Sequence, residues 1–406
     1  METKTPLETA VRNNLNWFLT SGIMDPGDGS WGVAERLTVA EGRALEQMRF
    51  SFPAWTDLSD CRVIEQRRAD CNFETALLFL LADKIFHDGG YAAVAEKLLS
   101  FLYCRSGLLN RGNPAYPDGS WNWSHICRES VVYYDDNAWC VFLPLAMARL
   151  RPDLDRKLEL SHWARILSEE LLKAFGRGIG SPSPTVPGAW EDPEGIWRGR
   201  LNLPHWGSLV VMALSRAAVA FEDIRPEPEI RRYHRHLQTT LGELSASEYG
   251  YAVLGAASAF RAFGLEEDRL LAVRAGEKIL SRMDPETGNL PAEHYEAPCG
   301  NRLVDTIYTL NWSFLALQLL TTLTGEEKFR RAKEKQLALL LRIQDPGPSP
   351  RFRGCWRGMY DLDRAAWGGG DCVEGGAGSI YSGWTNAPIA TGMLLEIAGK
   401  SLLDFF

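Results

Sequence analysis

Two adjacent aspartates, Asp135 and Asp136, stand in the segment YYDDNAW (133–139), directly before a long apolar run. An aspartate at the start of a helix caps it, a contribution on the order of 1 kcal/mol. One carboxylate meets that need, and adjacent side chains point about 100° apart on a helix. Hydrolysis of a glycosidic bond needs two carboxyl groups, one to protonate the leaving oxygen and one to act as nucleophile or to activate water. Catalysis and helix capping are therefore the two interpretations of this pair.

The elements that must position these aspartates are helices. Helical periodicity predicts about twelve segments. Short turns join most of them in pairs, and long connections separate the pairs. Loops of such length inside a compact fold are usually functional. The predicted segments are 7–20, 73–88, 90–105, 135–150, 155–175, 205–222, 226–244, 249–263, 266–283, 304–323, 326–344 and 385–399.

This alternation of short and long connections predicts a closed ring of helical hairpins. In such a ring all short turns lie on one face and all long loops on the other, with the first helix of each hairpin inside. The segment 326–344 is heavily charged and the segment 304–323 is not, as expected for an outer and an inner helix. The first and last segments are left to pair with each other. We predict an all-α (α/α)6 toroid, with residues 1–406 as a single domain and the long loops on one face.

The loop face is expected to gather carboxylates, aromatic rings and cations around one cavity. Asp136 is the first candidate for general acid/base, and Asp135 for nucleophile, water activation or positioning. Asp305 and Glu74 are reserve carboxylates in case one aspartate is only a cap. Tryptophans would stack on sugar rings, while Arg68 and His205 would orient polar groups. The candidate substrate-binding residues are Arg68, Tyr134, His125, His205, Trp206, Tyr308, Trp312, Trp356 and Trp384.

Composition and missing motifs exclude several classes of function. The net charge of -8, without a basic stripe, disfavours nucleic acid as a partner. The N-terminus lacks the apolar core of a signal peptide, and the run at 141–148 is too short to cross a bilayer, so we expect a cytoplasmic protein without a membrane partner. The scattered cysteines predict free thiols. No phosphate-binding loop, HExxH or GxSxG occurs. His125, His205 and His294 lie on separate loops, so neither a metal nor a cofactor is expected.

Two family resemblances also favour a ring of helical hairpins and a catalytic interpretation of the aspartates. YYDDNAW with its apolar helix resembles the aspartate-pair motif of the bacterial endo-α-1,6-mannanase family, whose helices form an (α/α)6 barrel. That resemblance implies Asp135 as nucleophile and Asp136 as acid/base. The segments DTIYTLNWSFLAL (305–317), TGEEKF, LLRIQD and GCWRGMYDLDRAAW resemble the six-hairpin glycosidase superfamily, which includes unsaturated glucuronyl and rhamnogalacturonyl hydrolases. Those hydrolases place an essential aspartate at the start of an inner helix, in a setting comparable to 133–136.

The sequence thus predicts a glycoside hydrolase acting on an oligosaccharide or glycoside by carboxylate catalysis. Arginines in or beside the loop-face segments could hold a uronate carboxylate in bidentate fashion, which makes a terminal uronic acid one candidate substrate. The alternative interpretation is that these arginines only offset nearby acids. A polysaccharide lyase or a sugar epimerase using Tyr or His on the same fold is the alternative chemistry. A carbohydrate-binding toroid without catalysis is the remaining alternative.

Overall fold

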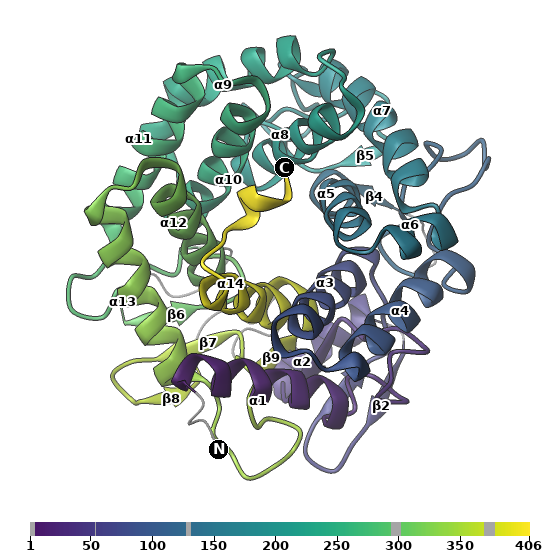
Figure 1. Cartoon of the computed structure of the whole chain (residues 1–406), viewed down its shortest axis with the longest axis vertical. Coiled ribbons are helices and arrows are strands. Elements are labelled where there is room, and N and C mark those ends of the chain that lie inside the picture. The colour runs from purple at the N-terminus through teal and green to yellow at the C-terminus, as the bar shows by residue number, and fades with distance from the viewer. Residues whose placement is uncertain (1–4, 53, 127–130, 294–301, 369–377) are drawn as a thin grey trace.

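The computed structural model describes residues 5–52, 54–126, 131–293, 302–368 and 378–406. Six helices form an inner ring in which each helix contacts the next and the last contacts the first (Figure 1). They are apolar on nearly every side because neighbours surround them. They are α3 (Ala69–Phe86), α5 (Tyr134–Leu150), α8 (Pro204–Phe221), α10 (Ala246–Phe263), α12 (Leu310–Thr324) and α14 (Ala387–Ile397).

A second set of helices surrounds this ring (Figure 1). These helices are amphipathic, with one face against the ring and charged residues outward. The outer helix α1 (Pro6–Thr20) packs against α14, so helices from the two ends of the chain close the ring. The predicted (α/α)6 arrangement is confirmed. The outer helices are α1 (Pro6–Thr20), α4 (Gly89–Cys104), α7 (Leu160–Gly178), α9 (Glu227–Thr240), α11 (Glu266–Arg282) and α13 (Glu327–Ile343).

Some element bounds differ from the prediction. The predicted helix 155–175 is two helices, α6 (Pro152–Leu158) and α7, because Glu159 between them adopts a left-handed φ of 57°. The predicted helix 304–323 begins only at Leu310. The helix α2 (Gly42–Ser51) lies in a stretch predicted to be loop, because its ten residues span fewer than three turns.

Short strands tie the long loops together. β2 (Trp55–Asp57), β3 (Arg62–Ile64), β1 (Arg36–Thr38) and β9 (Ser379–Tyr381) form one sheet in that order. β4 (Val132–Tyr133) pairs with β5 (Trp197–Arg198), and β6 (Leu303–Asp305), β7 (Met359–Asp361) and β8 (Ala366–Trp367) form a third sheet. β4 leads directly into α5, and β9 leads through a π-helical turn (Ser382–Asn386) into α14. The strands therefore fix the chain where inner helices begin.

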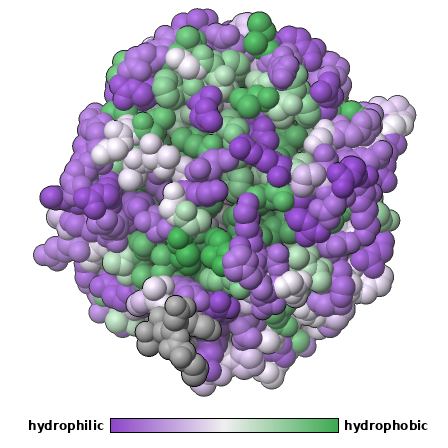
Figure 2. Space-filling model, viewed as in Figure 1, coloured by the Kyte–Doolittle hydropathy of each residue, from purple (hydrophilic) through white to green (hydrophobic). Residues whose placement is uncertain are grey.

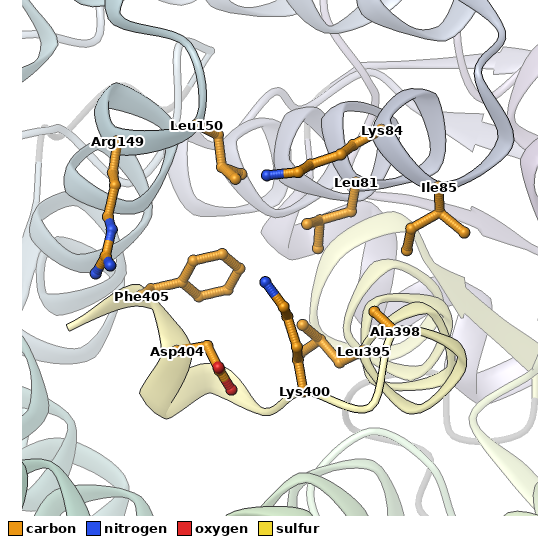
Figure 3. A pocket seen from close by; sticks show the side chains of 10 residues that line it. All are labelled: Leu81, Lys84, Ile85, Arg149, Leu150, Leu395, Ala398, Lys400, Asp404 and Phe405. Carbon is orange, nitrogen blue, oxygen red and sulfur yellow. The ribbon is translucent and has the colours of Figure 1, made fainter.

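The opposite end of the ring is covered by the last residues of the chain. The 3₁₀ helix η4 (Leu402–Phe405) crosses the middle of the ring, and Figure 2 shows apolar side chains gathered near the middle of this face. A cavity of about 360 Å³ lies here, with the Phe405 ring pointing into it and Lys84, Arg149 and Lys400 around it (Figure 3). Arg149 also donates a hydrogen bond to the Phe406 carbonyl.

Two further features concern the chain as a whole. The described cysteines Cys61, Cys71, Cys104, Cys140 and Cys355 are free. Among the described residues, no helix has both the length and the apolar character that a membrane span requires.

Candidate active site

A cavity of about 280 Å³ opens where the inner helices begin, at the end of the ring that carries the long loops. It brings together seven of the residues predicted from the sequence, namely Asp135, Asp136, Arg68, His205, Trp206, Tyr308 and Trp384. The rest of its lining consists of Glu35, Arg36, Phe52, Trp123, Tyr133, Ile307 and Tyr381. The larger cavity at the other end has no pair of carboxyl groups. The smaller cavity is therefore the candidate active site.

The two aspartates occupy the first turn of α5, but neither caps it. Tyr133 is the N-cap residue and makes no side-chain cap hydrogen bond. Asp136 Oδ1 instead lies 2.5 Å from Arg68 Nη2, and Asp135 Oδ2 lies 3.0 Å from His205 Nε2. The other oxygen of Asp135, Oδ1, is buried and has no hydrogen-bond partner in the described part of the chain. Capping therefore does not account for this pair.

Arg68 joins three carboxylates from different parts of the chain. Its guanidinium bonds Glu35 Oε1 at 2.9 Å, Asp70 Oδ2 at 2.7 Å and Asp136 at 2.5 Å. Glu35 also accepts from Arg36, whose Nε and Nη2 both lie 3.0 Å from Oε2. These groups are nearly removed from solvent, with exposed side-chain fractions between 0% and 11%. Three carboxyl groups thus share two guanidinium groups in a buried cluster.

This cluster favours the protonated form of its carboxyl groups. Burial raises the pKa of Asp136 well above its ordinary range; Arg68 acts in the opposite direction, while the charges of Asp70 and Asp135 add to the rise. Burial likewise raises the pKa of Glu74, again with Asp70 adding to it. One arginine does not offset every carboxylate that it faces, so the buried cluster binds a proton more readily than carboxyl groups in water do.

His205 is held in one orientation. It follows Pro204 at the start of α8, and its backbone N–H donates to Glu248 Oε2 at 2.7 Å. Its ring stacks on Trp206 and Tyr251, with centroid separations of 4.7 and 4.9 Å. The ring faces are thus covered, and the edge that carries Nε2 is directed at Asp135. His205 is therefore placed to orient Asp135.

Trp384 forms part of the cavity wall in a strained backbone conformation. It lies in the π-helical turn with φ 43° and ψ −29°, a region that costs a non-glycine residue on the order of 1–3 kcal/mol. Its backbone N–H donates to Glu74 Oε2 at 2.8 Å, and its indole N–H donates to Asp70 Oδ2 at 2.6 Å. Gly383 allows the close approach to α3, because a Cβ there would lie 2.7 Å from the Cα of Cys71. The first turns of α3 thus fix the Trp384 ring.

Six predicted site residues lie outside the cavity lining. Two of them are the reserve carboxylates. Asp305 accepts hydrogen bonds from the N–H groups of Ile307 and Tyr308 and from the Thr309 hydroxyl, which organises the turn before α12. Glu74 lies one layer deeper than the cavity and holds Trp384. Both are placed to support the site from behind.

Of the other four, Tyr134, Trp312 and Trp356 occupy packing positions and His125 is exposed. The hydroxyl of Tyr134 donates to the Ala174 carbonyl, and His125 Nδ1 accepts from the backbone N–H of Arg67. Trp312 and Trp356 are fully buried. Their indole N–H groups donate to the carbonyls of Ile307 and Leu340, respectively. Sugar stacking requires an open ring face, which neither tryptophan offers in this structure.

The prediction missed several lining residues. Arg36 begins the short strand β1 directly after Glu35, Tyr381 ends β9, and these strands pair with Arg36 opposite Tyr381. Three-residue strands carry too few residues for alternation to be recognised. Trp123 and Tyr133 precede the two aspartates in the sequence, so their aromatic character was a usable signal. Both residues are more exposed than Trp384.

Metal binding was weighed from the sequence because of three histidines. Within the described ranges, no group of three or more His, Cys, Asp or Glu side chains is arranged to hold a metal ion. His294, one of the histidines weighed as a ligand, lies outside the described residues.

Comparison with known proteins identifies the fold. No protein-family model matches the chain, and no curated protein matches its sequence. A D-mannose isomerase superposes with a TM-score of 0.65 at 12% sequence identity, and the superposition covers 100% of this chain and 98% of the isomerase chain. The α-1,6-mannanase from Salegentibacter sp. HEL1_6 gives 0.59 at 12% identity, with coverages of 96% and 98%. An unsaturated glucuronyl hydrolase specific for heparin gives 0.57 at 10% identity, with coverages of 98% and 99%.

These likenesses establish the six-hairpin (α/α)6 fold and, at such identities, the fold alone. The resemblance inferred from the sequence is thereby confirmed at the level of architecture. The fold is shared by glycoside hydrolases and by enzymes that isomerise or epimerise sugars. The chemistry of this chain has to be argued from its own cavity.

Proposed function

We propose that the protein is a glycoside hydrolase that acts on an oligosaccharide or glycoside. One observation carries the proposal: two carboxyl groups from adjacent residues reach the same aromatic cavity in different environments. Asp136 is buried with a raised pKa beside Arg68, whereas Asp135 is held by His205, and its buried Oδ1 makes no hydrogen bond to any described residue. The roles of acid and base are assigned from pairs of carboxyl groups whose environments push their pKa values apart.

In this proposal Asp136 is the general acid/base. Its raised pKa favours the protonated form, from which it can protonate the glycosidic oxygen as the bond to the anomeric carbon breaks. Arg68 then stabilises the carboxylate that forms, since it already contacts Oδ1. Asp135 would attack the anomeric carbon or take a proton from the attacking water. His205 holds Asp135 in position through Oδ2.

Aromatic side chains would hold the sugar. Trp206, Tyr308 and Trp384 were predicted for this role, and Trp123 and Tyr133 join them in the lining. A structure of the Salegentibacter mannanase supports the assignment by analogy, because it is of an inactive variant with two adjacent aspartates replaced by alanine, in complex with α-1,6-mannotetrose. A terminal uronic acid and a cytoplasmic location stay predictions from the sequence.

An isomerase or epimerase is the second candidate, favoured by the likeness to D-mannose isomerase. That chemistry needs a base beside a sugar carbon. His205 is less suited, because its Nε2 faces Asp135 and its ring faces are stacked. A lyase using tyrosinate is also disfavoured at Tyr133, because burial and the charges of Asp136 and Asp135 raise its pKa.

The test is product analysis in isotopic water. Aryl glycosides and oligosaccharides are incubated in H₂¹⁸O, and separately in D₂O, with wild type, Asp136→Asn, Asp135→Asn and the control Asp153→Asn, an exposed aspartate in α6. Hydrolysis places ¹⁸O at the new reducing end, and loss of the general acid is expected to lower the rate about 10²- to 10⁴-fold. The control should match wild type. Deuterium at a sugar carbon without cleavage would instead establish an isomerase or epimerase.

A further inference from the structure

Both arginines that line the cavity are already occupied by carboxylates of the protein. Arg36 donates twice to Glu35 Oε2, and its guanidinium lies over the rings of Tyr381 and Phe52, at 4.0 and 4.9 Å from their centroids. Arg68 is divided among Glu35, Asp70 and Asp136. Neither guanidinium presents the open fork that bidentate binding of a substrate carboxylate requires.

Carboxyl groups outnumber cations in and directly behind the cavity. The carboxyl groups are Glu35, Asp70, Asp135 and Asp136, and the cations are Arg36 and Arg68. Even with one of these carboxyl groups protonated, the cluster carries excess negative charge. Buried charges are weakly screened by salt, so a substrate carboxylate in the cavity would be repelled.

The other arginines singled out from the sequence are not part of the lining. Arg67 pairs with Glu65, and Arg357 pairs with Asp345. Arg198, Arg200 and Arg353 are exposed; of these, Arg198 lies opposite the lining residue Tyr133 in the β4–β5 pair. What the described cavity offers a ligand is aromatic surface, from Trp123, Trp206 and Tyr308 among others. Such rings suit the C–H faces of an uncharged sugar.

We infer that the sugar unit held in this cavity is uncharged, a neutral glycoside and not a uronic acid. This inference rests on the proposed function, which places a sugar in this cavity. It disfavours the terminal uronic acid that the sequence made a candidate substrate. The arginines near the site offset the protein's own carboxylates, which was the alternative interpretation of them.

Matched ligands that differ in one group test the charge directly. Binding of S-linked aryl thioglycosides, which resist hydrolysis, is measured by calorimetry on wild type in three forms: the neutral hexoside, its uronide and the methyl ester of that uronide. Gluco, galacto and manno series are compared. In the series that binds, the neutral hexoside and the ester should bind at least about tenfold tighter than the uronide, because like charges placed together are strongly disfavoured.

The outcomes separate this inference from the proposed function. A uronide that binds as tightly as its methyl ester, or more tightly, overturns the inference whether or not O-linked substrates are cleaved. Failure of every series to bind also overturns it. If neutral ligands bind but their O-linked counterparts are never cleaved, the inference holds and the proposed hydrolase activity is refuted.

A charge variant provides the second test. Glu35→Gln removes one carboxylate and releases Arg36 and part of Arg68, so the disadvantage of the uronide relative to its ester should shrink several-fold. The control is Asp57→Asn, on β2 of the same sheet but exposed and outside the cavity, which should leave the ratio unchanged. An unchanged ratio in folded Glu35→Gln would contradict the argument. If that variant does not fold, the ester comparison in wild type still decides.

Discussion

Replacing Asp70 by asparagine should move the pH range over which the enzyme works. Asp70 and Asp136 both contact Arg68 Nη2, at 2.7 and 2.5 Å, so their bonded oxygens lie no more than about 5 Å apart. With an effective dielectric constant near 20, two charges at that separation interact by about 3 kcal/mol, or roughly 2 pKa units. The charge of Asp70 is one cause of the raised pKa of Asp136. Removing it lowers that pKa.

The sign of the shift follows from the role proposed for Asp136. A general acid must be protonated in the free enzyme, so its pKa sets the alkaline limb of the kcat/KM profile. We expect this limb to move to lower pH by about 1–2 units in Asp70→Asn, since Arg68 then also interacts more strongly with Asp136. The profile is measured with an aryl glycoside that wild type cleaves, and Asp153→Asn serves as the surface control.

Two results would refute the reasoning. If the alkaline limb stays in place in folded Asp70→Asn, the two carboxyl groups are not coupled as their common contact indicates. If the limb moves to higher pH, Asp136 is not the group that must carry the proton. A ¹³C titration of the Asp136 carboxyl group in both proteins gives the same pKa without reference to activity.

Three further variants test how the site and the ring are held. Trp384→Phe loses the indole hydrogen bond to Asp70, and we expect kcat/KM to fall at least about tenfold with the melting temperature changed by only a few degrees. Phe405→Ala should lower the free energy of unfolding by about 3–5 kcal/mol in denaturant titrations, because a buried ring is lost. At Asp268, burial opposes the charge, but hydrogen bonds from His234 and Arg231 outweigh it and lower the pKa. The ionised Asp268 therefore stabilises the folded protein at pH values above its unfolded pKa, and this stabilisation is lost as pH falls through its folded pKa. Asp268→Asn should lower the free energy of unfolding by about 3–5 kcal/mol at pH 7 and by much less near pH 2.

The ring could be predicted because it depends on patterns that extend over many residues. Apolar periodicity in segments such as 205–222, and the alternation of short and long connections, report burial and topology directly. Bounds failed where a single residue decides. Glu159 ends a helix through a left-handed conformation that its residue type does not announce. Likewise, α2 has only ten residues, fewer than three turns, over which a helical period could show.

The site was predictable only as far as the start of each inner helix. Asp135, Asp136, Arg68 and His205 were found because the residues that begin inner helices converge in any closed ring of hairpins. Trp356 was misplaced because aromatic residues in loops pack the loops as readily as they line cavities. The hydrogen bond from Arg68 to Glu35 could not be predicted, since it depends on the pairing of β1 with β3, two strands of three residues each.

The adjacency of the two aspartates now has a geometric explanation. In the ring, α5 lies between α3 and α8 and contacts both. Adjacent side chains on a helix diverge by about 100°, so one aspartate of the pair reaches Arg68 before α3 and the other reaches His205 on α8. A single helix start thus supplies two carboxyl groups to one cavity and gives each a different partner. This arrangement supports the proposed hydrolase, which must donate a proton to the leaving oxygen while a second group attacks the anomeric carbon or activates water.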